Sequence, residues 1–326
     1  MLPAPNVDLT AWTVAQRGPK APAEPFRPQG FFLERERSAT GDVVDSACIL
    51  LTNRECPWRC LMCDLWKHTL DHTVPPGAIP AQVEFALSSL GCRPAQVKLY
   101  NSGSFFDPGA IPVADYPAIG GLVGFAQNIV VECHPRLVGE KVLRFRELLP
   151  AGLEVAMGLE TIHPVVLPRL NKRFDSRHFA EAAAFLLRHG VAVRTFLLVQ
   201  PPFLAEKESI EWALKSAQFA FSCGSSTVAL IPTRAGNGAM DELRKTGEFN
   251  PPTVATVESA MDLVLGNCQQ QGRVFVDLWN LEQFSSCPVC LHQRLKRLET
   301  MNLTQEVLPP VTCHACRSGQ VAITAR

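Results

Sequence analysis

Short apolar runs alternate with amphipathic stretches over most of the chain, from about residue 43 to residue 276. The apolar runs predict β-strands at 43–52, 96–100, 128–132, 154–159, 191–199 and 227–231, with one further strand at 273–276. Helical patterns lie between them, at 80–90, 116–127, 139–149, 176–189, 206–222 and 253–271. This alternation favours a parallel sheet with right-handed crossovers.

Six strand–helix units over about 190 residues are too few for a closed barrel of eight units. We therefore predict an α/β fold built on a partial (β/α)6 parallel barrel. The strand at 191–199 is almost wholly apolar, as expected when helices and neighbouring strands cover both of its faces.

The two ends of the chain differ from this middle section. Residues 1–40 contain six prolines and are predicted to form an irregular N-terminal arm, which residues 31–33 tie to the rest. The segment 281–326 carries four paired cysteines and is predicted to form a small, zinc-ribbon-like module. The predicted organisation is thus an arm at 1–40, a core at 41–280 and a cysteine-rich module at 281–326.

Composition narrows the class of protein. The 326 residues carry no formal net charge, which gives no global electrostatic argument for a nucleic-acid partner. The chain starts without a signal-like apolar segment and has no apolar run near the ~20 residues that span a membrane. Twelve cysteines without such a signal indicate metal ligands in a reducing compartment, so we expect a cytoplasmic protein.

The candidate chemistry starts with Cys56, Cys60 and Cys63, which follow the first predicted strand. A loop this short can place three thiolates around one face of an iron–sulfur cube, and it supplies no fourth. One iron would stay open for chemistry at the C-terminal mouth of the barrel, where active sites gather. A zinc site or three unrelated thiols are the alternatives.

The cysteine spacing, with Trp58 before the second cysteine of the three, resembles the signature of the radical S-adenosylmethionine (SAM) superfamily. The resemblance implies a [4Fe–4S] cluster on Cys56, Cys60 and Cys63, with SAM bound through its amino and carboxylate groups to the open iron. It further implies reductive cleavage of SAM to a 5′-deoxyadenosyl radical, with an electron donor for the cluster.

Polar residues that follow the predicted strands are the candidate SAM ligands. In radical SAM proteins a Gly-Gly-Glu-like segment after the second strand binds the SAM amino group, and Ser102, Gly103 and Ser104 stand there in this chain. Glu132 ends the third strand, where a carboxylate could accept both ribose hydroxyls. Glu160 and Lys172, twelve residues apart, match a polar residue and a carboxylate-binding cation of the coproporphyrinogen-oxidase-like branch.

Several segments resemble the archaeosine-synthase-type proteins, which belong with the elongator-catalytic-subunit-like enzymes of tRNA modification. These segments are 53–66, 101–108, 158–161 with 171–172, and 198–204. The resemblance implies that a tRNA nucleoside, a lysine-bearing 7-deazaguanine, loses a carbon–nitrogen bond after a partner enzyme has attached the lysine. Two alternatives stay open: radical chemistry on a small molecule or peptide, and a non-catalytic metal-binding nucleic-acid module.

The C-terminal cysteines form two pairs, Cys287 with Cys290 and Cys313 with Cys316. Two such pairs suit a tetrahedral structural zinc, which we favour over an auxiliary iron–sulfur cluster. Between the pairs lies a basic run with Arg294, Lys296 and Arg297. It is interpreted either as a solvated helix face or as a surface that contacts RNA phosphates.

Overall fold

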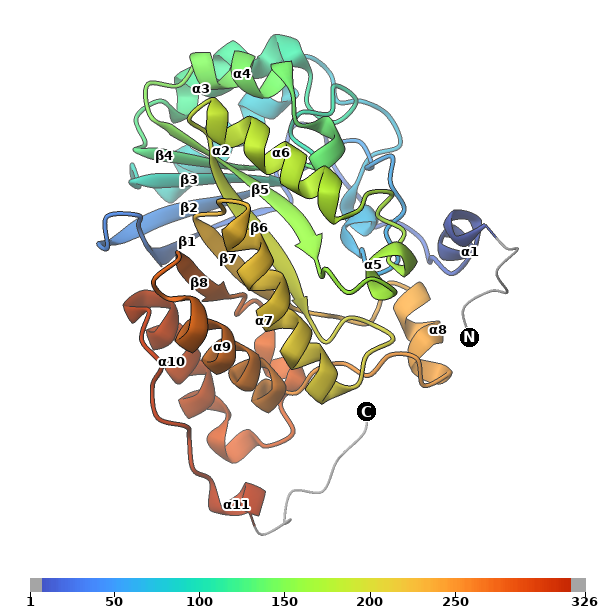
Figure 1. Ribbon diagram of the computed structural model, residues 1–326. Helices are drawn as coiled ribbons and strands as arrows, with labels where there is room; N and C mark the ends of the chain where they lie inside the picture. Colours follow the sequence, from blue (N-terminus) through green and yellow to red (C-terminus); the bar gives the residue numbers. More distant parts are fainter. Residues whose placement is uncertain (1–7, 318–326) are drawn as a thin grey trace.

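The computed structural model describes residues 8–317 and contains an eight-stranded sheet that curls into a half-barrel (Figure 1). The strands follow chain order: β1 (Gly30–Arg37), β2 (Val43–Leu51), β3 (Gln96–Asn101), β4 (Asn128–Glu132), β5 (Gly152–Glu160), β6 (Ala192–Val199), β7 (Thr227–Pro232) and β8 (Arg273–Val276). Neighbouring strands from β2 to β8 are parallel, which confirms the predicted partial barrel.

Helices connect the strands and cover the outer face of the sheet (Figure 1). They are α2 (Ala78–Leu90), α3 (Tyr116–Val123), α4 (Glu140–Glu147), α6 (Ser176–Arg188), α7 (Glu206–Ser222) and α9 (Val254–Cys268). Shorter or peripheral helices are α1 (Leu9–Ala15), α5 (Val166–Arg169), α8 (Ala239–Lys245), α10 (Pro288–Thr304) and α11 (His314–Arg317), with single 3-10 turns at Leu65–His68, Val113–Asp115, Pro135–Leu137 and Leu281–Phe284. None of the described helices is long and apolar enough to cross a membrane.

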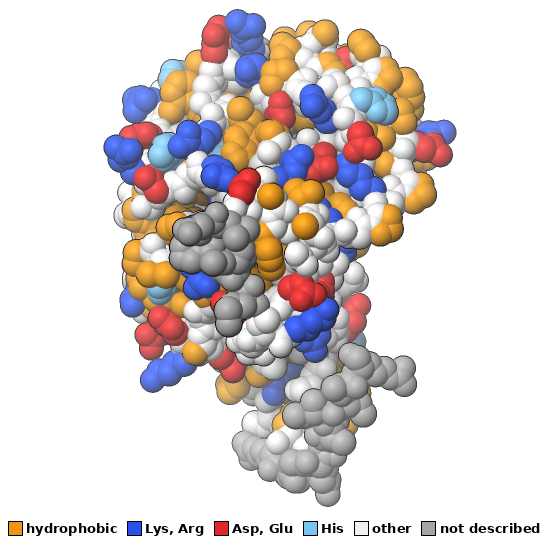
Figure 2. All heavy atoms as spheres, turned by 90° about the vertical axis from the view of Figure 1, so that its right-hand side faces the viewer, with side chains coloured by type: hydrophobic (Ala, Val, Ile, Leu, Met, Phe, Trp, Pro, Cys, Tyr) orange, Lys and Arg blue, Asp and Glu red, His pale blue; other side chains and the backbone are white. Residues whose placement is uncertain are grey.

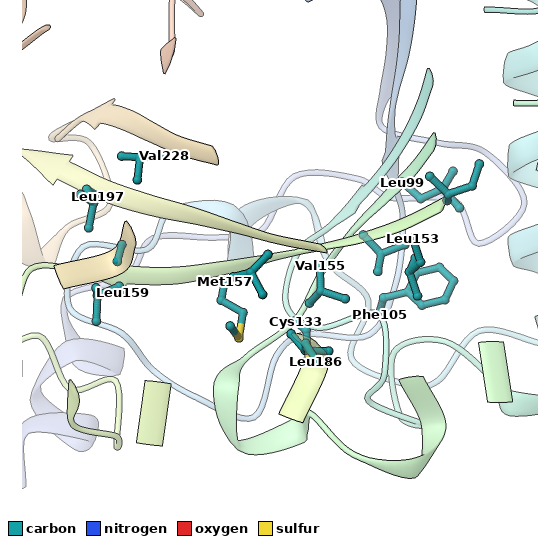
Figure 3. Close-up of a cluster of buried hydrophobic side chains, with 14 of the residues drawn as sticks. Leu99, Phe105, Cys133, Leu153, Val155, Met157, Leu159, Leu186, Leu197 and Val228 are labelled. Carbon is teal, nitrogen blue, oxygen red and sulfur yellow. The ribbon is translucent and has the colours of Figure 1, made fainter. Parts of the chain in front are cut away.

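The main core lies between the sheet and these helices. Leu99, Leu153, Val155 and Met157 point from β3 and β5 toward the helix layer, where they meet Leu186 of α6 (Figure 3). Because successive residues of a strand point to opposite faces, the residues between them face the inside of the barrel. The sequence of each strand thus encodes an apolar outer face and a lumen that can hold polar groups.

The floor of the lumen is a buried network of charges. Arg194 donates to Glu36 at 2.6 Å and to Glu154 at 3.0 Å, and Lys98 forms an ion pair with Glu36. These four side chains are all less than a tenth exposed. Buried charges persist when they are paired in this way, so the floor is a neutral, hydrogen-bonded closure of the barrel.

The end of the expected N-terminal arm is a regular strand. β1 pairs with β2 in antiparallel register, from Gly30 opposite Leu50 to Arg37 opposite Val43. The sequence pattern did not predict this strand, because its inward position 36 is a glutamate rather than an apolar residue. Glu36 is buried by the charge network of the floor, so a charged residue here occupies an inside position.

The C-terminal helix α10 shares the core of the barrel. Leu298 and Met301 of this helix are fully buried in the main hydrophobic cluster, and α10 packs on β1, β8 and α9. The C-terminal segment, predicted to be a separate module, therefore packs against the barrel through α10. The boundaries at residues 40 and 280 stay predictions, and residues 1–7 and 318–326 of the predicted end segments lie outside the described part of the chain.

Candidate active site

The segment 52–64, called the cysteine loop below, is held by side-chain amides from distant parts of the chain. Asn237 donates to the backbone carbonyls of Leu61 at 2.8 Å and Cys63 at 3.1 Å. Asn171 donates to the carbonyl of Arg59 at 2.6 Å. A loop without regular structure has unpaired backbone groups, and here tertiary contacts satisfy them. Its shape is therefore fixed by the fold.

A cluster of charges ties the same loop to the N-terminal segment. The Glu55 carboxylate forms ion pairs with Arg17 at 2.7 Å, Lys20 at 2.8 Å and Arg59 at 3.2 Å. Burial alone raises the pKa of Glu55, but the hydrogen bonds from Lys20 and Arg17 outweigh it and hold the pKa below its usual value. Glu55 is therefore a charged anchor for the residues just before the first loop cysteine.

The three loop cysteines line one large cavity inside the barrel mouth, of about 1140 Å³. The cavity also contains most of the other predicted site residues, namely Ser102, Gly103, Glu132, Glu160 and Lys172. Burial raises the pKa of the Cys56 thiol to about 12, of Cys60 to about 11 and of Cys63 to about 12. Without a bound cation the thiolate forms are therefore disfavoured.

The arrangement of these thiols fits a polynuclear cluster better than a single ion. They interact electrostatically with one another: Cys56 with Cys63, Cys60 with Cys56, and Cys63 with Cys60. They nevertheless do not form a group of ligands compact enough for one ion; among residues 8–317 such a group is found only near the C-terminus. In an iron–sulfur cube each thiolate binds a different iron, which suits a wider triangle.

Glu160 and Lys172 form a buried ion pair at the rim of the cavity. Burial lowers the pKa of Lys172, but the Glu160 carboxylate more than offsets this and holds the pKa above its usual value. The sheet register shifts between Gly158 and Glu160, and Glu160 has a positive φ of 67°. A Cβ on Gly158 would lie 2.7 Å from Lys172 Nζ and closer still to Glu160, so a side chain at this position would have to displace the ends of the pair.

Glu132 lies at the end of β4, and its carboxylate has one hydrogen bond in the described structure, from the Asn101 backbone amide at 3.0 Å. Burial raises the pKa of Glu132 to about 8, although this hydrogen bond opposes the shift. A carboxyl group of this kind is mostly protonated near neutral pH. Donors from a bound ligand would stabilise its charged form.

Ser102 and Gly103 face the cysteine loop, whereas Ser104 does not line the cavity. The Ser102 amide donates to Asn53 at 3.1 Å, and a Cβ on Gly103 would lie 3.1 Å from that of Cys56. The Ser104 hydroxyl donates to the sulfur of Cys133, which itself lines the cavity, at 3.4 Å. The predicted place of Ser104 beside the SAM amino group stays a prediction.

His134 is a site residue that sequence reasoning missed. Its ring stacks on Trp58, with ring centres 3.8 Å apart and planes 9° apart. His134 Nε2 bonds the carbonyl of Lys172 at 3.0 Å, and Nδ1 accepts from the Arg136 amide at 3.2 Å. Burial lowers the pKa of His134 to about 3, so the ring is neutral. The sequence signal that could have identified His134 was its position, two residues after a predicted strand that ends at the rim of the cavity.

The four C-terminal cysteines, called the cysteine tetrad below, come together at the start of α10. Their sulfurs all lie within 4.8 Å of one another; Cys287 and Cys313 are 4.0 Å apart, and Cys290 and Cys316 are 3.7 Å apart. The predicted grouping of these residues is therefore present in the structure.

The basic run between the two cysteine pairs is mostly engaged within the protein. Arg297 is buried and donates to Asp262 at 2.7 Å and to Glu258 at 3.3 Å, while Arg294 forms an ion pair with Glu258. Lys296 is exposed and pairs with Glu299 at 2.8 Å. The prediction that all three cations contact RNA is wrong for Arg297, because its guanidinium is buried in contacts with Glu258 and Asp262 of α9.

Comparison with known proteins finds relatives named archaeosine synthase subunit beta. The chain is 34% identical over 166 residues to archaeosine synthase subunit beta of Thermococcus kodakarensis, covering 49% of this chain and 51% of that protein. It is 26% identical over 219 residues to the same subunit of Methanosarcina acetivorans, covering 63% and 62%. The alignments thus span about half to three-fifths of these curated relatives. No family model matches the chain.

Among solved structures, methylornithine synthase (PylB) is similar with a TM-score of 0.50 at 13% sequence identity. The alignment covers 69% of this chain and 63% of that one. At this level of identity the likeness concerns the fold alone.

Proposed function

From the place of this chain in the radical SAM superfamily, in its elongator-like group, we propose that it modifies a nucleoside carried by tRNA. It is an enzyme of the radical SAM type. Within that class, the activity we propose is cleavage of a carbon–nitrogen bond, as in archaeosine formation.

The observation that carries the proposal is the convergence of the cysteine loop with Glu132, Glu160 and Lys172 on one cavity. We propose that Cys56, Cys60 and Cys63 hold a [4Fe–4S] cluster. When bound, such a cluster donates an electron that cleaves SAM and so provides a 5′-deoxyadenosyl radical. The stacked pair of Trp58 and His134 braces the loop against β4 and keeps the thiols at the cavity wall.

The charged residues of the rim are suited to the functional groups of SAM. Lys172 gives one of its three N–H donors to Glu160, which leaves two for a carboxylate. Glu132 can accept hydroxyl donors of a ribose once it ionises. Gly103 brings backbone close to Cys56, so backbone oxygens of this turn could accept from the amino group of SAM. The assignment of these residues to SAM is part of the proposal.

The names of the relatives support tRNA as the substrate, and surface charge supports only a local contact with RNA. Figure 2 shows basic and acidic side chains interspersed over one face, without a large patch of either sign. Lys296 and His292 line the cavity, and the side chain of Lys296 is 62% exposed. Phosphate contacts of this kind predict tRNA binding that weakens as salt rises.

The test uses full-length protein, reconstituted without oxygen and reduced with dithionite, together with SAM and one of two tRNAs. One tRNA carries the lysine-bearing 7-deazaguanine and the other lacks it. We expect 5′-deoxyadenosine and loss of the lysine adduct with the first tRNA only. The Cys92→Ser variant, which removes an exposed thiol outside the cavity lining, should behave as the parent. An unchanged tRNA beside rapid SAM cleavage would refute the substrate.

A small molecule or peptide is the second candidate substrate. The zero net charge and the burial of Arg297 favour it, because they leave little positive surface for a polyanion. In the same experiment this alternative predicts turnover with the free modified nucleoside or a lysine-containing compound, at a rate that added tRNA does not change.

A further inference from the structure

The half-barrel has an open side between its two edge strands, β1 and β8, and α10 lies across it (Figure 1). One face of α10 forms a wall of the active-site cavity, through His292, Leu295, Lys296, Glu299, Asn302 and Leu303. The position of this helix therefore determines the shape of the cavity on the side opposite the parallel strands.

The C-terminal end of α10 is fastened to the free edge of β8 by two side-chain amides. Asn302 accepts from the Val276 amide and donates to its carbonyl, both at 2.9 Å. Gln305, just after the helix, makes the same two bonds to Val274, at 2.7 and 2.8 Å. These amides take the place of a ninth strand and satisfy backbone groups that an edge strand leaves unpaired.

At the other end of α10 the cysteine tetrad holds the first turn, ahead of the ion pairs that Arg294 and Arg297 make with α9. Cys287 caps the helix and Cys290 lies in its first turn, while Cys313 and Cys316 come from the segment that folds back on it. A tetrahedral ion with bonds of about 2.3 Å would place its sulfurs about 3.8 Å apart. The pairs at 3.7 and 4.0 Å match this spacing. Thiolates on separate irons of a cube would lie farther apart.

A neighbouring cation fits a thiolate site that carries excess negative charge. Four thiolates and one divalent ion leave two negative charges on the site. Arg294 Nε donates to the Cys290 sulfur at 3.2 Å, and its other end pairs with Glu258 of α9. This hydrogen bond links the tetrad to the layer of helices behind α10.

We propose that the cysteine tetrad binds a single zinc ion, and that this ion fixes α10 as the wall that closes the open side of the barrel. The ion is structural, because four protein ligands leave no position for a reactant. The proposal stands independently of the substrate, since it concerns the wall of the cavity and not the chemistry inside it.

The first arm of the test identifies the metal. In the full chain carrying Cys56→Ala, Cys60→Ala and Cys63→Ala, any remaining metal belongs to the tetrad. We expect one zinc per chain, with no iron or sulfide, and loss of that zinc when Cys290→Ser and Cys316→Ser are added. The Cys92→Ser substitution serves as the matched control and should keep the zinc. Iron with sulfide, or no metal at all, would overturn the proposal.

The second arm measures hydrogen exchange in the wild-type chain before and after a chelator removes the zinc, and again after zinc is restored. We expect exchange in 288–304 and in β8 to speed up about tenfold without zinc and to recover with it. The Asn302→Leu and Gln305→Leu variants should keep the zinc and speed up exchange in β8 and at the C-terminal end of α10, while its first turn stays protected. Exchange in α10 that zinc removal leaves unchanged would show that the ion does not hold the wall.

Discussion

The cysteine loop and the cysteine tetrad use the same side chain in opposite ways. The loop directs three thiols at a cavity of about 1140 Å³, which also holds the Glu160–Lys172 pair and the singly bonded Glu132 carboxylate. The tetrad gathers four sulfurs within 4.8 Å of one another, away from that cavity. Three ligands leave a coordination position for a reactant, whereas four enclose the ion. The two sites have the same kind of ligand, so the number and spacing of the thiols distinguish the open site from the closed one.

The largest effect should come from removing the cation of the open site. Lys172→Met leaves the Glu160 carboxylate buried without its partner, which should cost about 3–5 kcal/mol of unfolding free energy. Urea denaturation measures this cost. Lys245→Met breaks an ion pair on the surface and should change little. A Lys172→Met protein as stable as the parent would mean that the pair is not buried as described.

The second prediction concerns protons at Glu132. Its pKa in the folded protein, about 8, lies above that of an unfolded chain, about 4.3, so the folded state binds more protons between these values. The contribution of Glu132 to stability is therefore complete below about pH 4 and is lost as pH rises through 8. Glu132→Gln should remove this loss, which is on the order of a few kcal/mol.

Thermal unfolding at pH 5 and pH 8 tests the sign of the Glu132 effect: relative to the parent, Glu132→Gln should be more stable at the higher pH. Ligand binding tests the same group. If hydroxyl donors ionise Glu132, SAM binding at pH 7 should release close to one proton, measured by calorimetry in buffers of different ionisation enthalpy. Equal heats in all buffers would remove Glu132 from the ligand site.

A smaller effect should follow from loosening the loop. Asn237→Leu removes two donors to loop carbonyls and should cost about 1–3 kcal/mol, because those carbonyls stay buried. Weaker cluster retention should accompany the loss, read as iron per chain after gel filtration. Asn267→Leu, which removes an exposed bond within α9, is the matched control and should leave both quantities unchanged.

The smallest effect is expected at the aromatic stack. Trp58→Leu keeps an apolar side chain but loses the stacked contact with His134, worth about 0.5–1.5 kcal/mol. Because His134 is neutral over the usual range, the loss should be the same at pH 5 and pH 8. A loss that grew at low pH would indicate a protonated ring and contradict the assignment.

The sequence predicted the parallel strands and most helices because each has an apolar face with a clear period. It also predicted that the loop cysteines, Glu132, Glu160 and Lys172 meet at one edge of the sheet, and these residues line one cavity. It missed what depends on contacts between distant segments. Trp58 and His134 are 76 positions apart, and nothing in either neighbourhood indicates a stack.

Two predictions from the sequence were wrong for the same physical reason. β1 was read as irregular because Glu36 occupies an inside position that only Lys98 and Arg194 make tolerable. Arg297 was read as a surface cation because Glu258 and Asp262, which bury it, lie on another helix. Charge patterns along a chain do not reveal such partners.

The central claim is that the open site, and not the closed one, performs the chemistry. Anaerobic formation of 5′-deoxyadenosine from SAM tests it most directly, in two variants of the full chain. One carries Cys56→Ala, Cys60→Ala and Cys63→Ala, and the other carries Cys287→Ser and Cys290→Ser. We predict no product above background from the first, with an unchanged circular dichroism spectrum, and SAM cleavage retained in the second. Wild-type rates from the loop variant would contradict the account.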